Sequence, residues 1–456
     1  MQLRPYQAEA IDKLRSAYKT GKKSLLLVAP TGAGKTVMFS SIVANRIGRG
    51  LTTMILVHRQ ELVDQVVRTL AAFGVTAGVI AAGSPATDSL VQVASVWTLS
   101  RRLHRHAPPQ LLIIDEAHHA VAQSWQKVIT AYSNAIVLGV TATPERQSGE
   151  GLDALFQDMI LGPTVAQLQD IGALCHARTF APPGPDLSGV ATRMGDWVPS
   201  ELELAVEKSS VMGDAIAHYK SHCDGEPAIA FCVSVKHAQH VAEQFRQAGY
   251  TAVSIDGSME KEERKGIVKE FTDGRINILT SCDLVSEGFD VPRATAAILL
   301  RPTQSRALFL QQCGRCLRPW LGKERAVILD HAGNTGRFGL VSDEQQWTLS
   351  GRKRRAGSKK PAVPEGVRIC TSCFSASRAT GSACFHCGTA FPIKQRATRV
   401  VEGSLVEVTA SPVRKRRQLN PATDYAGLVA LGKQRGYRAP EIWARHIINA
   451  RLKKGR

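Results

Sequence analysis

A loop near the amino terminus has residue types suited to holding the phosphates of a nucleotide. It runs Ala29-Pro30-Thr31-Gly32-Ala33-Gly34-Lys35-Thr36, between an apolar run at 24–28 and a helical pattern, which is the strand–loop–helix context of a phosphate-binding loop. Glycines let backbone N–H groups close around phosphates, and the helix N-terminus adds its positive dipole. Lys35 should reach the β- and γ-phosphates, and Thr36 should hold Mg²⁺ through its hydroxyl. The residues expected to surround the phosphates are Gly32, Ala33, Gly34, Lys35 and Thr36.

Two adjacent carboxylates, Asp115 and Glu116, end another apolar run at 111–114. Asp115 can hold Mg²⁺ through water, and Glu116 can polarise the water that attacks the γ-phosphate. Paired carboxylates at a strand end can be plain surface residues, but these follow a phosphate loop at the distance such a site needs. Together the two segments predict hydrolysis of ATP.

Four cysteines towards the carboxyl end have the spacing of a tetrahedral metal site, Cys370-x2-Cys373-x10-Cys384-x2-Cys387. Each Cys-x-x-Cys can present two thiolates, and thiolates are preferred ligands of Zn²⁺. His386 is an alternative ligand, although four cysteines already complete the set. The other six of the ten cysteines are scattered, so the pattern fits a reducing cytosol and a single zinc site.

Apolar runs of strand length alternate with helical patterns through most of the chain, which predicts parallel sheets with helical crossovers. We expect an α/β fold of two tandem units, followed by a small zinc-binding module and a helical tail. In residues 424–454 the spacing of Leu428, Leu431, Trp443, Ile447 and Leu452 predicts a small helical hairpin. The expected strands are 24–28, 53–57, 91–95, 111–114 and 136–140 in the first unit, and 228–233, 252–255, 276–279, 296–300 and 326–329 in the second.

Changes in composition suggest where the domains meet. Ala181-Pro182-Pro183-Gly184-Pro185 indicates a linker between the two α/β units, and Arg352-Lys353-Arg354-Arg355 opens a basic linker. The expected domains are 1–180 with the nucleotide site, 181–345, a basic linker at 346–369, a zinc module at 370–390 and a basic, partly helical tail at 391–456.

Positive charge is concentrated towards the carboxyl end. Residues 351–456 contain 23 Lys and Arg against 5 Asp and Glu, a net +18 of the chain's +19. A nearly neutral body with a basic tail predicts a polyanion partner, although such a run is often only a solvated tail. No apolar run reaches the roughly 18 residues of a transmembrane helix, and the opening residues lack the apolar core of a signal peptide, so we expect no membrane partner.

The motifs, taken in order, resemble those of superfamily 2 helicases of the DEAD/DEAH type over residues 3–335. So many motifs in one order are specific even though each alone is weak. The resemblance implies two RecA-like domains that bind ATP and Mg²⁺ in the cleft between them. The matching segments are Arg4-Pro5-Tyr6-Gln7, the phosphate loop, His58-Arg59-Gln60-Glu61-Leu62, Asp115-Glu116-Ala117-His118, Thr141-Ala142-Thr143-Pro144, Glu287-Gly288-Phe289-Asp290-Val291-Pro292 and residues 311–318.

The resemblance also implies roles for single residues, with Gln7 reading the adenine base. It implies that Arg4, Gly288 and Asp290 also bind the nucleotide. The residues that would couple ATP hydrolysis to domain movement are His118, Thr141, Thr143 and Gln311. The nucleic acid would be contacted by Arg59 and Thr98. One departure concerns the fifth motif, where Cys282 stands in place of a frequent Thr. Thr280 and Ser281 are close by, so the residue that touches the nucleic-acid backbone stays open.

The last motif, Gln311-x-x-Gly314-Arg315-x-x-Arg318, places two arginines about one helical turn apart on one face. Phosphoryl transfer needs a cation where negative charge grows on the γ-phosphate. We therefore expect Arg315 and Arg318 to act as arginine fingers beside the catalytic Lys35 and Glu116. Cys313 and Cys316 form a Cys-x-x-Cys in the same motif, which we interpret as incidental because a metal would disturb the arginines.

The architecture is similar to that of bacterial RadD-like repair ATPases and of bacteriophage-encoded DNA helicases. The resemblance implies a helicase or translocase acting on DNA in replication, recombination or repair, in the cytoplasm of a bacterium or a phage-infected cell. The alternatives are a nucleotide-switched DNA clamp that recruits partners without unwinding, and an RNA helicase. The basic tail would add phosphate contacts and can recruit repair or replication proteins.

Overall fold

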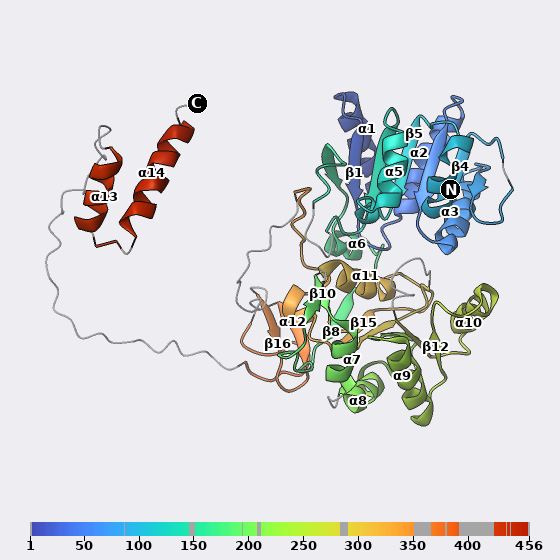
Figure 1. The fold of residues 1–456 in the computed structure, drawn as a ribbon. Coiled ribbons are helices and arrows are strands. Elements are labelled where there is room, and N and C mark those ends of the chain that lie inside the picture. Colours follow the sequence, from blue (N-terminus) through green and yellow to red (C-terminus); the bar gives the residue numbers. More distant parts are fainter. Residues whose placement is uncertain are drawn as a thin grey trace. The chain divides into compact units, whose positions relative to one another are not determined.

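The computed structural model describes residues 2–85, 87–145, 151–193, 195–207, 211–282, 291–350, 366–378, 381–391, 424–434, 436–437 and 439–454. The chain divides into two compact units, residues 1–393 and residues 394–456. The first unit contains two large sheets, each covered by helices (Figure 1).

The first sheet is parallel, with the strand order β3-β4-β2-β5-β6-β1-β7. Its strands are β1 (Ser24–Val28), β2 (Thr53–Val57), β3 (Gly78–Ile80), β4 (Val91–Ser95), β5 (Leu111–Asp115), β6 (Ile136–Thr141) and β7 (Asp158–Leu161). The helices are α1 (Pro5–Lys19), α2 (Lys35–Ile47), α3 (Gln60–Ala72), α4 (Val96–Arg102), α5 (Gln123–Ala131) and α6 (Val165–Asp170), with short 3-10 turns η1 (Leu103–Arg105) and η2 (Ala117–His119).

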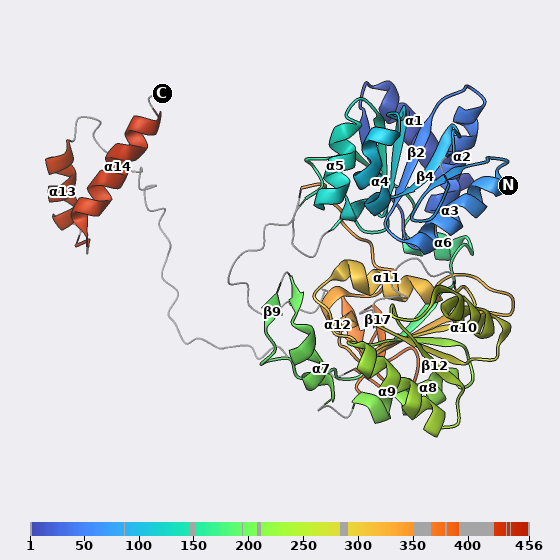
Figure 2. The same ribbon diagram turned by 45° about the vertical axis from the view of Figure 1, so that its right-hand side comes forward.

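Strand β1 shows why this sheet needs helices on both faces. Leu25 and Leu27 pack into the core beneath α1, α2 and α3, whereas Leu26 and Val28 pack into the core shared with α4 and α5. Figure 2 shows α4 and α5 together, apart from α2 and α3. A parallel strand buried on both faces is a continuous apolar run, as the sequence predicts.

The second sheet has the order β12-β13-β11-β14-β15-β8-β17-β16, parallel as far as β8 and antiparallel beyond it. Helices α8 and α9 cover one face, and α10 and α11 cover the other. The strands are β8 (Ala177–Phe180), β11 (Ala228–Phe231), β12 (Ala252–Ile255), β13 (Ile278–Ser281), β14 (Ala296–Leu299), β15 (Ala326–Asp330), β16 (Val367–Ile369) and β17 (Ser375–Arg378). The remaining elements are a small hairpin of β9 (Thr192–Arg193) and β10 (Asp196–Trp197), and helices α7 (Pro199–Glu207), α8 (Val211–Cys223), α9 (Val235–Gln247), α10 (Lys261–Asp273), α11 (Arg306–Cys316) and α12 (Thr335–Phe338).

Strand β8 lies at the end of the region 1–180 that we expected to form the first domain, yet it pairs in parallel with β15 of the second sheet. Its outer edge pairs with β17, so the cysteine-bearing segment 366–378 extends the second sheet and is not a detached module. Backbone N–H and C=O groups need partners when a strand edge is covered, and here the partner comes from almost two hundred residues later in the sequence.

The segment expected as a basic linker, 346–369, begins with residues that pack on the first domain. Trp347 and Leu349 contact the core shared with α4 and α5. The backbone N–H of Leu152 donates to the Leu349 carbonyl at 2.8 Å. The chain therefore returns from the second sheet to the first domain before it reaches the cysteines.

The second unit contains the expected helical hairpin, formed by α13 (Tyr425–Gln434) and α14 (Pro440–Lys454). Leu428 and Ala444 are fully buried between the helices. Gly432 allows their close approach, since a Cβ there would lie 2.9 Å from the Pro440 Cβ. Among the helices of the described ranges, none has the length and apolar character needed to cross a bilayer.

Candidate active site

The phosphate loop connects β1 to α2 and depends on two glycines with left-handed backbone. Gly32 and Gly34 have φ of +87° and +81°, a conformation that favours glycine. A Cβ at Gly34 would lie 2.4 Å from Gln7 Nε2. Gln7 is buried and donates from Nε2 to the Ala33 carbonyl at 3.2 Å. The expected adenine-recognition segment therefore packs directly on the phosphate loop.

Arg4 is held beside the same loop by Gln7. The Arg4 backbone N–H donates to Gln7 Oε1 at 3.0 Å at the start of α1. Tyr6 adds a hydroxyl that donates to the Ala33 carbonyl at 3.2 Å. Residues at both ends of Arg4-Pro5-Tyr6-Gln7 are thus fixed relative to the loop.

Lys35 begins α2, and its ammonium group is turned back on its own loop. Nζ donates to the carbonyls of Ala29 at 3.2 Å and Pro30 at 3.5 Å. Burial lowers the pKa of Lys35, while Glu116 and Asp115 act in the opposite direction. The lysine therefore shares one electrostatic environment with both carboxylates, as a phosphate-binding lysine must.

Asp115 ends β5 and Glu116 follows it in a left-handed conformation, with φ +47° and ψ +54°. Burial and the neighbouring Glu116 raise the pKa of Asp115 to about 7. The Glu116 N–H donates to Asp115 Oδ1 at 3.0 Å. Within the described part of the chain, Glu116 Oε2 is buried without a hydrogen-bond partner, which leaves an acceptor for a water molecule.

His118 connects the carboxylates to the end of β6. Its Nδ1 is 3.0 Å from Thr141 Oγ1 and 3.5 Å from Glu116 Oε2. The Thr141 hydroxyl donates to the Thr143 carbonyl at 3.0 Å, so its oxygen must accept from the N–H of the His118 ring. Three of the expected coupling residues thus form one buried hydrogen-bonded chain.

Helix α11 brings the arginine motif of the second sheet onto the phosphate loop. A Cβ at Gly314 would lie 2.7 Å from Thr31 Cβ, and Arg318 Cγ is 3.5 Å from the Cβ position of Gly32. Arg315 is only 6% exposed and Gln311 only 4%. Burial is the main cause of the lowered pKa of Lys35, and charge repulsion from both arginines lowers that pKa further. Arg318 lies two residues beyond the last residue of α11, so a turn carries it rather than the helix face we expected.

An ion pair that the motifs do not predict joins the two sheets beside this site. Arg306 begins α11 and binds both carboxylate oxygens of Glu145, with Nε to Oε2 at 3.1 Å. Its guanidinium lies 4.7 Å from the Trp347 ring and donates to Gln345 at 3.1 Å. Glu145 comes directly after Thr143-Pro144, so the contact ends at the coupling motif. The only sequence signal would have been the adjacency of Glu145 to that motif.

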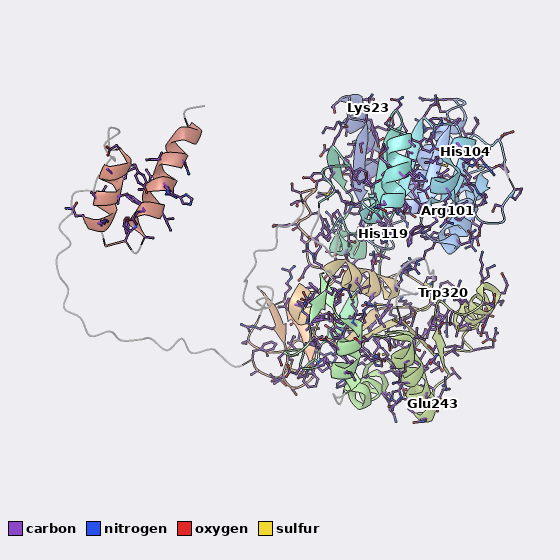
Figure 3. The ribbon with its side chains drawn as sticks, viewed as in Figure 1. Lys23, Arg101, His104, His119, Glu243 and Trp320 are labelled. Carbon is purple, nitrogen blue, oxygen red and sulfur yellow. The ribbon has the colours of Figure 1, made fainter. Side chains whose placement is uncertain are left out.

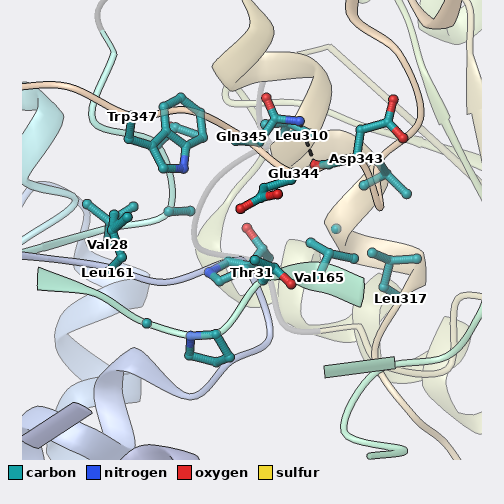
Figure 4. A pocket seen from close by; sticks show the side chains of 18 residues that line it. Val28, Thr31, Leu161, Val165, Leu310, Leu317, Asp343, Glu344, Gln345 and Trp347 are labelled. Atoms are coloured by element: carbon teal, nitrogen blue, oxygen red, sulfur yellow. Dashed lines mark hydrogen bonds between the residues drawn. The ribbon is translucent and has the colours of Figure 1, made fainter. Parts of the chain in front are cut away.

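A cavity of about 100 Å³ lies between the phosphate loop and α11 (Figure 4). Thr31, Leu310 and Trp347 are among its walls, whereas Lys35, Asp115 and Glu116 are not. Because Pro30 and Thr31 of the phosphate loop and Gly314 of α11 also line it, the cavity lies directly beside the nucleotide site.

The four cysteines form one cluster. Sγ of Cys370 lies 3.7 Å from that of Cys387, Sγ of Cys373 lies 3.7 Å from that of Cys384, and all four lie within 4.8 Å of one another. Zinc–sulfur bonds of about 2.3 Å in a tetrahedron place sulfurs about 3.8 Å apart, so this geometry suits the metal. The His386 ring packs edge-on against Phe180 instead, which leaves the four thiols as the donor set.

Two family descriptions match the chain, "Type III restriction enzyme, res subunit" over residues 1–146 and "Helicase conserved C-terminal domain" over residues 208–319. A 51.5 kDa protein of a Lactococcus phage is 33% identical, covering 81% of this chain and 79% of its own length. The chain belongs to the superfamily 2 helicases.

Two further comparisons agree with that family. The DNA 3'-5' translocase XPB2 of Sulfurisphaera tokodaii is 24% identical over 72% of this chain and 81% of its own. A fragment assigned to the HsdR subunit of a type I restriction enzyme from Vibrio vulnificus has the same fold, with a TM-score of 0.56 and 23% identity over 74% of this chain and 65% of that one. Membership of the superfamily 2 helicases makes the protein an ATP-hydrolysing enzyme of helicase type that acts on nucleic acid.

The family implies Mg²⁺ with ATP, and the donors at this helicase's site suit it. The Thr36 hydroxyl and the Asp115 carboxylate are hard oxygen ligands of the kind that Mg²⁺ prefers. The raised pKa of Asp115 results from burial beside a second carboxylate. That environment favours a divalent cation at this position.

The expected nucleic-acid contacts of the helicase follow two neighbouring strands. Val57 of β2 pairs with Ser95 of β4, so Arg59 and Thr98 both come just after the carboxyl ends of these strands. Among the fifth-motif candidates, Thr280 donates to the Ala238 carbonyl at 2.7 Å and is buried. Gly288 and Asp290 lie outside the described residues.

The cysteine pair inside the arginine motif of the helicase is buried in α11. Cys313 and Cys316 are fully covered, and the Cys316 thiol donates to the Cys313 carbonyl at 3.2 Å. Burial raises the pKa of Cys316 to about 11. Protonated, enclosed thiols are consistent with our interpretation of this Cys-x-x-Cys spacing as incidental.

Proposed function

We propose that this helicase is a DNA-stimulated ATPase that moves along or separates DNA strands. The observation that carries the proposal is the convergence of the lysine, two carboxylates and two arginines of separate motifs around one loop. The name of the Sulfurisphaera translocase supports DNA as the substrate. So does the net +18 of residues 351–456, since basic side chains add phosphate contacts without reading sequence.

In this proposal each catalytic group meets a different part of ATP. Lys35 leaves the carbonyls of Ala29 and Pro30 for the β- and γ-phosphates. Glu116 orients the attacking water, and Arg315 and Arg318 neutralise charge that grows on the γ-phosphate. Thr36 and Asp115 would hold Mg²⁺, which supplies positive charge against the same phosphate oxygens.

Coupling between hydrolysis and movement is assigned to the contacts around Thr141. A change at Glu116 would be transmitted through His118 to Thr141 and Thr143, at the edge next to α11. Gln311 is buried in α11 beside the arginines. Gly288 and Asp290 would add nucleotide contacts, and Arg59 and Thr98 would bind the nucleic-acid backbone.

We also propose one zinc ion bound by Cys370, Cys373, Cys384 and Cys387, with a structural role. The basic tail would increase affinity for DNA and recruit repair or replication proteins. The proposed domains are the two RecA-like domains, with β8 assigned to the second, and the tail.

Two assays test the proposal. ATP turnover is measured alone and with single-stranded DNA, duplex DNA or RNA, and strand displacement is measured on a partly duplex DNA. Stimulation by DNA with displacement is the expected result. Stimulation only by RNA would identify an RNA helicase, and DNA stimulation without displacement or translocation would favour a nucleotide-switched clamp.

A further inference from the structure

Helix α4 presents an unusual outer face next to the expected nucleic-acid contacts. Trp97 is 59% exposed, although Trp is normally among the more buried side chains. The helix does not depend on Trp97 for its anchorage, because Val96 and Leu99 are fully buried in the core. The indole is therefore available to a ligand.

Basic side chains follow this tryptophan along α4 and η1. Residues 96–106 run Val-Trp-Thr-Leu-Ser-Arg-Arg-Leu-His-Arg-His. Arg101 is one helical turn from Trp97, and Arg101, His104 and Arg105 are exposed. In the described ranges no carboxylate pairs with Arg101 or Arg105. The pKa of His106 is lowered mainly by burial and further by the positive charges of Arg102 and Arg105. The second cause shows that the local field is positive.

The position of this face relates it to the strand-binding edge. Because β2 and β4 are parallel and Val57 pairs with Ser95, Arg59 and Trp97 each lie two residues beyond the ends of neighbouring strands. Figure 3 shows Arg101 and Lys23 towards opposite ends of the first domain. Lys23 precedes β1 and marks the amino-end edge of the sheet, away from α4.

We infer that the surface of α4 and η1 that carries Trp97, Arg101, His104 and Arg105 binds single-stranded DNA. Trp97 stacks on an unpaired base, and the two arginines contact adjacent phosphates. An exposed aromatic beside cations is the chemistry of single-strand binding, because every base has a π-face and every nucleotide a phosphate. The inference rests on the proposed function and extends its nucleic-acid site beyond Arg59 and Thr98.

The test uses the full chain and a labelled oligothymidylate, titrated without ATP. Trp97→Ala should weaken binding about tenfold, since one base–aromatic stack is worth about 1–3 kcal/mol, and Trp97→Phe should recover most of the loss. Binding to an oligonucleotide of abasic sites should be equal for the wild type and Trp97→Ala. Replacing Arg101 and Arg105 with Ala should reduce the salt slope by about 0.7 for each phosphate that the variant no longer neutralises.

Lys23→Ala is the matched control for loss of one positive charge. It should change neither the affinity for oligothymidylate nor the salt slope of binding by a comparable amount. Unchanged binding in Trp97→Ala, or an equal loss on duplex and abasic DNA, would overturn the inference. Turnover without DNA should be the same in all variants. Failure of the proposed function would be seen in a different measurement, because no nucleic acid would then stimulate ATP turnover by the wild type.

Discussion

Single side chains at the phosphate loop determine what the enzyme can do before any domain moves. The Lys35 ammonium lies on the carbonyls of its own loop, and Glu116 keeps a buried oxygen that accepts no hydrogen bond from the described residues. Both groups are thus positioned for a ligand rather than for mutual pairing. The short segments that carry them explain why sequence alone predicts this part of the site.

Changing Glu116 should separate binding from hydrolysis. Glu116→Gln keeps the shape of the side chain but removes the charge that orients water, so ATP should still bind while turnover falls about 10²–10⁴-fold. Lys35→Ala should lose turnover and weaken ATP binding, because the phosphates lose their principal cation. A nucleotide-binding titration beside a phosphate-release assay measures both. Near-normal turnover in either variant would contradict the site.

The arginines should affect turnover more than affinity. Arg315→Ala and Arg318→Ala should each bind ATP yet hydrolyse it about 10³-fold more slowly, the lower end of the range for arginine fingers, because two residues share the task. Arg325→Ala, which removes an ion pair to Glu226 and a hydrogen bond to the His222 carbonyl, is the control. Sharply weaker ATP binding with normal turnover would refute the finger role.

At the scale of elements, α11 holds the two sheets together at the coupling motif. Its first residue binds Glu145, and Gly314 packs on Thr31. A shift of this helix would move the arginines and the coupling motif together. In the proposed mechanism, closure of the cleft would therefore act on the phosphates through this helix.

The ion pair between Arg306 and Glu145 offers a direct test of that role. Arg306→Ala and Glu145→Gln should each reduce DNA-stimulated turnover about tenfold, or about 1.4 kcal/mol, with little change in KM for ATP. Lys261→Ala breaks another ion pair between the same domains, to Asp64 at 2.9 Å, and should leave turnover nearly unchanged. Equal effects from both pairs would indicate general docking rather than coupling.

Removing the metal should affect the second sheet more than the nucleotide site. We expect one zinc per chain by metal analysis, lost when Cys370 and Cys373 are changed to Ser. ATP turnover should survive, since the tetrad is apart from the phosphate loop, while thermal stability should fall because metal binding supplies folding free energy. Zinc retained in the double variant, or none in the wild type, would reject the site.

Elements defined by local sequence were predicted well, and those defined by distant pairing were not. The phosphate loop, the carboxylate-ending strand and the helical hairpin are each contiguous in the chain. Strand β8 was missed because its partners β15 and β17 lie far along the sequence. The Arg306–Glu145 pair spans 161 positions, so no local pattern could reveal it.

At the scale of the whole molecule, the basic tail should set affinity without setting hydrolysis. Residues 394–456 form a separate unit with 15 Lys and Arg against 4 Asp and Glu, a net +11. Truncation after Ile393 should weaken DNA binding more than basal turnover. The log–log salt slope should fall by a few units, since each phosphate contact contributes about 0.7–0.9. Equal slopes for the full and truncated chains would mark the tail as a solvated or protein-docking arm.

The pairing of β17 with β8 also bears on whether the protein self-associates. Without β16 and β17, which flank Cys370 and Cys373, β8 would end the second sheet with a row of unpaired N–H and C=O groups beside the buried Phe180. An uncovered edge of this kind is a template for strand addition between molecules. Metal depletion would then appear first as self-association, with turnover lost only as the protein leaves solution.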